Sequence, residues 1–244
     1  MPINQPTDQL SFEEPIKQIP INQTNNSNLN TKLETHNTNQ LIKQPSPDFV
    51  DVGKNLTSSK PSTLEIDNQL LKACEKGKVK EIKVLLSKNN IDVNEKDENT
   101  FTPLIYACQY GYLEAVELLL QDPRLDINCE DKCGQTAFYH ACSVNQKEIV
   151  KSLLRHPNLD VNIADKSIGW SPLICASIRG YSEIVELILT SPKLVDLEAT
   201  NKLGATALDC ARAENKMDII KLLEAYEKNP TEIRTQLQKK YGKT

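Results

Sequence analysis

The chain has 244 residues, of which 39% are hydrophobic and 25% charged, and its formal net charge is -4 at pH 7. This is the composition of a soluble globular protein, and the missing basic excess argues against a nucleic-acid or anionic-membrane surface at the level of the whole chain. The sequence has no run of 18 or more apolar residues, and its N-terminus has neither the basic start nor the apolar core of a secretory signal. We therefore expect a cytoplasmic protein, with the nucleus as the alternative.

Residues 1–63 are rich in Asn, Gln, Thr, Ser and Pro and show no sustained apolar periodicity. Such a segment cannot bury enough apolar surface to offset about 1–2 kcal/mol of backbone entropy per residue, so we expect a disordered tail. Two short apolar islands, residues 10–12 and 47–52, are either docking peptides for a partner or stray apolar residues. The second interpretation is the one that we favour.

The middle of the chain repeats itself. Five segments of similar sequence each contain an alanine in an apolar context, and the successive spacings between these alanines are 34, 34, 35 and 35 residues. A fixed period in this range predicts a solenoid, in which each unit buries its apolar face against its neighbours. The alanines are Ala73, Ala107, Ala141, Ala176 and Ala211.

Each unit is expected to contain two helices. A Ser or Thr stands five residues before the alanine in units two to five, where it is suited to cap a first helix, and Pro103 and Pro172 follow it at the first helical position. A Gly or Asn stands four residues after each alanine and tolerates the left-handed conformation that ends a helix. Apolar residues at i, i+3 and i+4, such as Val116, Leu119 and Leu120, then predict an amphipathic second helix.

An extended segment and a turn follow the second helix. The segments 91–94, 125–128 and 159–162 share the pattern Ile/Leu-Asp-Val/Ile-Asn, and residues 131–134 are typical of a turn. We therefore expect a hairpin-like loop between successive units.

These patterns resemble the ankyrin-repeat family. Residues 102–107 (Thr-Pro-Leu-Ile-Tyr-Ala) and 171–176 (Ser-Pro-Leu-Ile-Cys-Ala) are similar to its Thr-Pro-Leu-His-x-Ala signature, without the histidine. The resemblance implies an all-α solenoid of five helix-turn-helix units, here one or two residues longer than usual, with the extra residue in 122–125. The first unit lacks Thr-Pro and is charged, as an N-terminal cap requires. The implied domain covers residues 64–228, with repeats at about 68–100, 101–134, 135–169, 170–204 and 205–228.

Residues 229–244 predict a short C-terminal helix. Asn229 is suited to its N-cap, Pro230 to its first turn and Gly242 to its end. One apolar stripe, at Ile233, Leu237 and Tyr241, favours a helix that caps the open end of the stack. The alternative is a partner-binding helix, because this tail is locally basic.

No pattern in the chain predicts catalysis, a cofactor or a metal site. The cysteines beside the repeating alanines are expected to be small buried hydrophobes with reduced thiols. Cys129 and Cys133 have no second Cys or His pair at zinc-ligand spacing, and the three histidines are scattered. We expect His140 to pack against a neighbouring unit and His156 to lie at a solvated helix end.

The family resemblance also implies where a partner binds, namely at the hairpin tips and the exposed positions of the first helices, on the concave surface. Large aromatic residues and Arg dominate interfaces energetically, so the strongest candidates are Phe101, Tyr110, Trp170 and Arg179. The alternative for Phe101 and Trp170 is packing against their own hairpins. The full predicted set is Phe101, Gln109, Tyr110, Gln135, Val144, Trp170, Ile178 and Arg179.

The sequence therefore predicts an intracellular protein–protein interaction module, monomeric on its own, that binds a protein partner and neither nucleic acid nor membrane. The alternative is an adaptor or regulatory subunit that recruits substrates to an enzyme complex such as a ubiquitin ligase. An ankyrin-type fold does not name the partner.

Overall fold

The structure is a computed structural model that describes residues 63–242. Within this range the chain forms eleven helices and no strand. The predicted disordered tail and its two apolar islands lie outside the described residues, apart from Thr63, which begins the first helix. The helices are α2 (Thr63–Glu75), α3 (Val79–Leu86), α4 (Pro103–Tyr110), α5 (Leu113–Leu120), α6 (Ala137–Ser143), α7 (Lys147–Leu154), α8 (Pro172–Arg179), α9 (Ser182–Thr190), α10 (Ala207–Ala213), α11 (Met217–Lys228) and α12 (Pro230–Tyr241).

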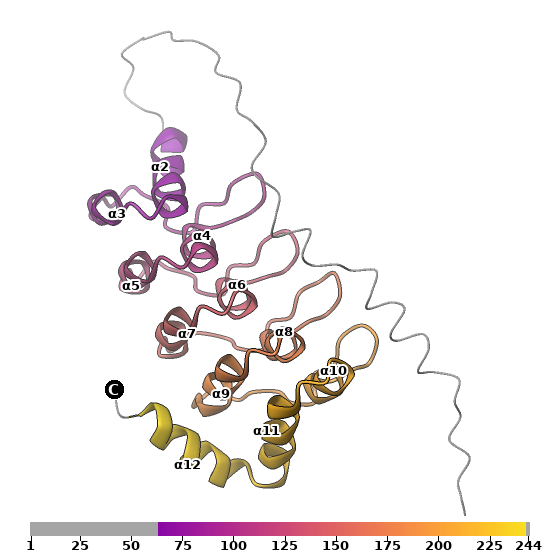
Figure 1. Ribbon diagram of the computed structural model, residues 1–244. Helices are drawn as coiled ribbons and strands as arrows, with labels where there is room; N and C mark the ends of the chain where they lie inside the picture. The colour runs from indigo at the N-terminus through magenta and orange to yellow at the C-terminus, as the bar shows by residue number, and fades with distance from the viewer. Residues whose placement is uncertain (1–62, 243–244) are drawn as a thin grey trace, which may run out of the picture. The chain divides into compact units, whose positions relative to one another are not determined.

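Ten of these helices form five pairs that stack into two layers (Figure 1). The inner layer packs in the order α2, α4, α6, α8, α10, and the outer layer in the order α3, α5, α7, α9. The five repeating alanines are almost completely buried in the inner helices, where their small side chains allow neighbouring units to approach closely. The predicted all-α solenoid of five units is confirmed.

The helix ends follow the expected chemistry. The hydroxyl oxygen of Thr102 accepts a hydrogen bond from the amide of Ile105 at 3.2 Å, and Thr136, Ser171 and Thr206 do the same in the next three units. Gly111 and Gly180 end their helices in the left-handed conformation, with φ of 81° and 77°. Asn145 and Asn215 take the same role at φ of 60° and 54°, which few other side chains tolerate.

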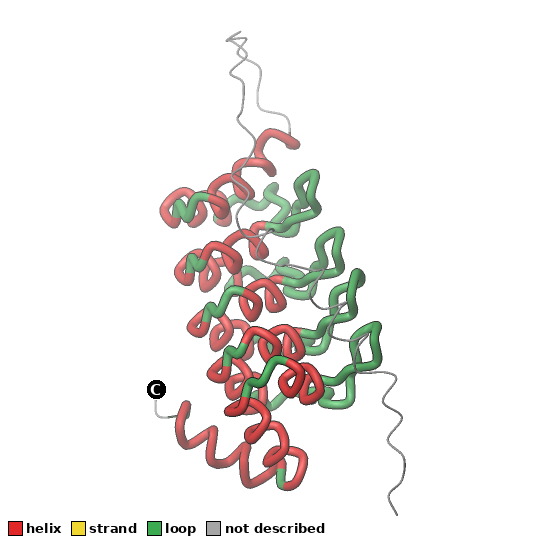
Figure 2. The backbone as a smooth tube through the Cα atoms, turned by 45° about the vertical axis from the view of Figure 1, so that its right-hand side comes forward, coloured by secondary structure: helices red, strands yellow, loops and turns green. Residues whose placement is uncertain are grey.

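The hairpin-like loops project side by side from the helix layers (Figure 2). The predicted extended segments form no strand: residues 93–94 and 127–128 are turns, and residue 161 is a bend. A single antiparallel bridge, between Glu130 and Thr136, is formed in the described loops. Neighbouring hairpins are joined by backbone bonds, from the amide of Lys166 to the carbonyl of Cys133 at 2.7 Å and from Lys202 to Ile168 at 3.0 Å.

A ladder of asparagine side chains also joins the units. The side-chain amide of Asn94 donates to the carbonyl of Arg124 at 2.8 Å, and its oxygen accepts from the amide of Asp126 at 2.8 Å. Asn128 makes the same pair of bonds to Asn158 and Asp160. Asn162 repeats the pair one unit later, with Leu194 and Asp196. The repeated Asn of the sequence pattern thus satisfies loop backbone that would otherwise be unpaired.

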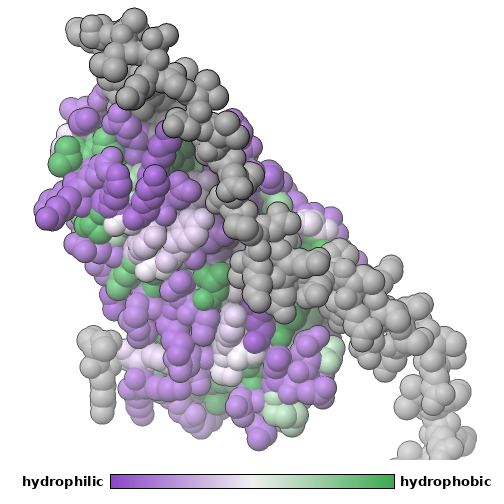
Figure 3. Space-filling model, turned by 45° about the horizontal axis from the view of Figure 1, so that its top comes forward, coloured by the Kyte–Doolittle hydropathy of each residue, from purple (hydrophilic) through white to green (hydrophobic). Residues whose placement is uncertain are grey.

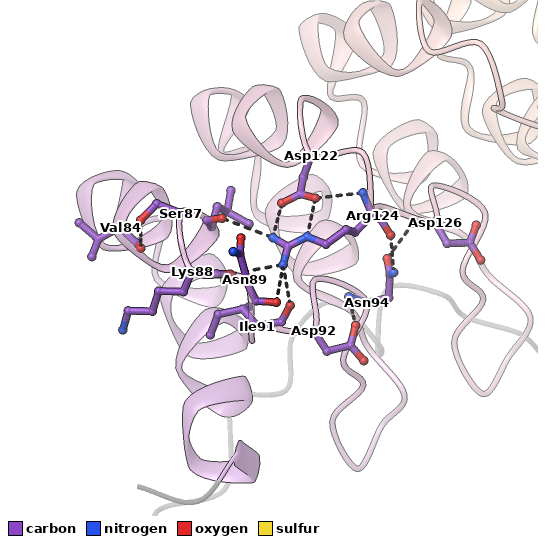
Figure 4. A network of polar contacts seen from close by, with 11 residues as sticks. Val84, Ser87, Lys88, Asn89, Ile91, Asp92, Asn94, Asp122, Arg124 and Asp126 are labelled. Atoms are coloured by element: carbon purple, nitrogen blue, oxygen red, sulfur yellow. Dashed lines mark hydrogen bonds and ion pairs between the residues drawn. The ribbon is translucent and has the colours of Figure 1, made fainter. Parts of the chain in front are cut away.

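The longer loop between the second and third units has a structural role. Arg124 turns back onto the first unit, where its guanidinium donates to the carbonyls of Leu86, Lys88 and Ile91 at 3.1 to 3.3 Å (Figure 4). These carbonyls belong to the last residue of α3 and to the loop after it, so they have no partner within the helix. Asp122 holds the guanidinium through a pair of bonds at 2.9 and 2.6 Å, and the hydrogen bonds from Arg124 lower the pKa of that carboxyl.

The C-terminal helix packs against both α11 and α9, as a cap at the end of the stack. Asn229 caps its start through the amide of Glu232, and Leu237 is its buried residue. Lys240 forms an ion pair with Glu186 of α9 at 2.5 Å, and the hydroxyl of Tyr241 donates to the same carboxylate. No helix among residues 63–242 is long and apolar enough to cross a membrane.

Candidate partner-binding surface

The eight residues predicted to bind a partner lie on the inner helices and on the hairpins that lead into them. We call the surface that they form the inner face. It consists of Phe101, Gln109, Tyr110, Gln135, Val144, Trp170, Ile178 and Arg179.

Three of these residues occupy the same place in successive hairpins. The carbonyls of Phe101, Gln135 and Trp170 accept hydrogen bonds at 2.9 to 3.1 Å from the amides of Asp97, Asp131 and Asp165. Each bond closes a hairpin just before the capping hydroxyl of an inner helix. The backbone therefore fixes the position of each of these side chains at the junction of hairpin and helix.

Aromatic rings form a continuous row over the second and third units. Phe101 meets both Tyr106 and His140 edge to face, with ring centroids 5.3 Å apart in each pair. Tyr106 lies parallel to Tyr110 at 6.2 Å, and Tyr110 lies 6.2 Å from Tyr112. We call these five residues the aromatic row. Tyr110 is its most accessible member, with 50% of its surface exposed.

Tyr106 is anchored at the centre of the row. Its hydroxyl donates to the carboxylate of Asp97 in the preceding hairpin. Burial raises the pKa of Tyr106, and this hydrogen bond raises it further. Glu75, from the first unit, raises the pKa of both Tyr106 and Tyr110 through its charge, so the row has an acidic side.

His140 is held by a buried carboxylate rather than free to act as a base. Its Nε2 atom lies 3.0 Å from Oδ2 of Asp131, and both side chains are buried. The other oxygen of Asp131 accepts from the amides of Cys133 and Gln135. Burial opposes ionisation of Asp131, but the hydrogen bonds from His140 and the backbone outweigh it and hold its pKa below the usual value. The contact between His140 and Asp131 thus fixes the hairpin onto α6, which is a structural role for His140.

The remaining predicted residues differ in how accessible they are. Trp170 is only 8% exposed, so its indole packs within the hairpin junction, whereas Phe101 is half-buried. Gln109, Val144, Ile178 and Arg179 are half-buried at the last turn or end of their inner helices. The choice between packing and partner binding stays a prediction for each of these residues.

The cysteines have the properties of packing residues. Burial raises the pKa of Cys74 to about 12 and that of Cys129 to about 11, so their thiols are protonated at neutral pH. All seven cysteines are free. Among residues 63–242, no group of three or more His, Cys, Asp or Glu side chains is arranged to hold a metal ion.

Sequence reasoning missed Tyr106, Tyr112 and His140 as members of this surface. Tyr106 and Tyr110 lie four residues apart on one helix, which is a signal that their rings are neighbours. The contacts of Phe101 with His140, and of Tyr110 with Tyr112, join different elements and had no such signal.

Comparison with known proteins gives one match. A family model described as ankyrin repeats (3 copies) matches residues 39–131 and 123–201, which together make up more than half of the chain. A search of curated proteins finds none that matches this chain.

Proposed function

Because the chain belongs to the ankyrin-repeat family, we propose that it is an intracellular interaction module that holds a protein partner on the inner face, the concave surface of its stack, without catalysing a reaction. Ankyrin repeats are generally protein–protein interaction modules.

The aromatic row is the observation that carries it. Its rings are held by one another and by Asp97, so they lose little conformational freedom when a partner binds. Tyr110 projects a half-exposed ring from this row. Buried aromatic residues at the centre of an interface each contribute about 2 kcal/mol or more to binding.

The thiols support a cytosolic location as part of the same proposal. The seven cysteines are unpaired, and five of them are buried at packing positions beside the repeating alanines. Unpaired thiols persist in the reducing environment of the cytosol and nucleus.

Substitution of Tyr110 tests the proposal. Partners of the full-length wild-type protein are captured from a lysate and identified, and the Tyr110→Ala variant is then compared by titration with the purified partner. We expect the affinity to fall by about 30-fold, the equivalent of about 2 kcal/mol. Tyr110 is a better test than Trp170, because replacement of the buried indole would also destabilise the hairpin.

Met217→Ala is the matched control. Met217 is an exposed apolar residue at the start of α11 in the fifth unit, outside the aromatic row, and its loss should leave the affinity within about twofold of the wild type. Equal affinities of the wild type and Tyr110→Ala, or equal losses in both variants, would place the partner elsewhere.

A further inference from the structure

The outer helix of the first unit carries a concentration of positive charge that the proposed function does not use. Residues 76–88 contain five lysines and one glutamate, a net charge of +4, whereas the whole chain carries -4. All five lysines are exposed. Of these five described lysines, only Lys78 forms an ion pair, with Glu81 at 3.0 Å. The other lysines are Lys76, Lys80, Lys83 and Lys88.

These lysines share one side of α3 with an exposed apolar residue. Lys80, Lys83 and Val84 are three or four residues apart on α3 and therefore lie on one face, and Lys88 follows two residues after the end of the helix. Figure 4 shows Val84 and Lys88 pointing away from Asp122 and Arg124 of the second unit. We call these four residues and Lys76 the basic patch.

Helix formation does not account for the lysine at position 80. In the other four units the equivalent position, in the first turn of the outer helix, holds a carboxylate, which the positive end of the helix dipole favours. Lys80 places the opposite charge there, at a cost to helix stability. The four carboxylates are Glu114, Glu148, Glu183 and Asp218.

The requirement that a terminal repeat has a polar, solvent-exposed outer surface does not account for the patch either. Both ends of a repeat stack must be polar, but either sign of charge serves. The fifth unit mixes the two signs on its outer helix α11, which carries Asp218, Lys221 and Glu224, and it pairs Glu224 with Arg212 at 2.8 Å. In the first unit, by contrast, five exposed lysines surround a single exposed carboxylate, Glu81, among residues 76–88. Figure 3 turns this end toward the viewer and shows it as mostly hydrophilic.

Val84 adds an apolar contact to this charge. It is 61% exposed, whereas Leu187, at the equivalent position of the fourth unit, is 3% exposed against its neighbours. An apolar side chain surrounded by lysines suits a ligand that is acidic and carries an apolar group of its own.

We propose that the basic patch binds an acidic segment of a protein, with carboxylates on Lys80, Lys83 and Lys88 and an apolar side chain on Val84. A short segment fits better than nucleic acid for two reasons. The patch has no aromatic ring on which a base can stack. The next outer helix exposes Glu114 and Glu117, which would repel an extended polyanion. This site is separate from the inner face, so the result of its test does not depend on whether the proposed function is correct.

The test uses the full chain and a fluorescein-labelled synthetic peptide that repeats Glu-Glu-Leu-Glu, with binding followed by anisotropy. We expect binding that weakens as salt is raised from about 0.05 to 0.3 M. The double variant Lys80→Glu/Lys83→Glu should bind at least tenfold more weakly, and Val84→Ser about threefold more weakly. Lys80→Glu alone should bind the peptide more weakly, while its Tm stays equal to that of the wild type or rises, because the variant has the carboxylate that the other units carry at this position. An unchanged Tm would rule out unfolding as the cause of the weaker binding.

Lys221→Glu is the matched control, since Lys221 is the exposed lysine of the fifth unit at the position equivalent to Lys83. It changes the net charge as Lys83→Glu does and should leave the affinity within twofold. No binding of the peptide, an equal loss in Lys221→Glu, or tighter binding of a DNA duplex or of phosphatidylserine vesicles than of the peptide would overturn the proposal.

Discussion

Individual polar side chains, rather than strands, hold the loops of this protein in place. Asp131 accepts two amides of its own hairpin and also contacts His140, and Asn201 accepts the amides of Leu203 and Ala205 in the equivalent place. An Asn side chain therefore serves the loop as well as an Asp side chain does. What Asp131 adds is a charge beside a histidine.

This difference predicts a pH dependence of stability. Because the pKa of Asp131 is lowered in the folded state, its contribution is present above the pKa of the unfolded chain, about 3.9, and is lost as the pH falls through the folded value. Asp131→Asn should reduce the free energy of unfolding by about 1 kcal/mol at pH 7. The difference in unfolding free energy between the wild type and this variant should become smaller as the pH is lowered through about 4. Urea unfolding at several pH values measures it.

Glu117→Gln, which replaces an exposed carboxylate on α5, is the control and should keep the pH dependence of the wild type. A constant difference between Asp131→Asn and the wild type from pH 7 to pH 3 would show that the charge of Asp131 contributes nothing.

The asparagine ladder predicts a second effect of a single side chain. Asn128→Ala removes two hydrogen bonds to the next unit and leaves the carbonyl of Asn158 and the amide of Asp160 without them. We expect a loss of about 1–2 kcal/mol of unfolding free energy in urea. Glu198 takes the place of the ladder Asn at the end of the series, and Glu198→Ala should change stability by less than about 0.5 kcal/mol. Similar losses in the two variants would contradict the ladder.

The C-terminal helix shows how an element with little apolar surface is held. Leu237 is its buried residue, and most of its other anchors are polar: Lys240 and Tyr241 bind Glu186, and Arg234 donates to the hydroxyl of Tyr226 at 2.6 Å. The basic residues that raised the alternative of a partner-binding helix are thus partly engaged with the stack itself.

Leu237→Ala should therefore release this helix in preference to the rest of the protein. Loss of the buried side chain is expected to cost about 2 kcal/mol, which exceeds what the exposed ion pair can offset. Hydrogen exchange should accelerate in residues 230–241 and remain slow in α4, α6 and α8. Gln238→Ala, at an exposed neighbouring position, is the control. Equal acceleration throughout the stack would mean that α12 unfolds only with the whole domain.

At the scale of the whole molecule, local chemistry explains why the fold was predictable. Capping hydroxyls such as Thr102, prolines at the first helical position and left-handed residues such as Gly111 and Asn145 act within a few residues along the chain. Their recurrence every 34 or 35 residues then requires the units to stack, because no single unit can bury its apolar face alone.

The surface was less predictable, because it is built from contacts between units. The position of Phe101 was expected on the hairpin junction, but its contact with His140 of the next unit depends on how closely the units approach. Trp170 was expected at the equivalent junction, but its burial depends on the neighbouring segments that pack against it. The exposure of Val84 on the first unit likewise depends on which elements lie beside it.

The sequence by itself determined the helices, their ends, the number of units and the order of the stack, because short-range capping and periodic apolar residues set these features. Only the tertiary structure decided which side chains meet between units, including the contact of Phe101 with His140, the asparagine ladder and the bonds of the Arg124 guanidinium to carbonyls at the end of α3. The physical reason is that these contacts depend on distances of a few ångströms between segments 30 or more residues apart, which periodicity brings together but does not align.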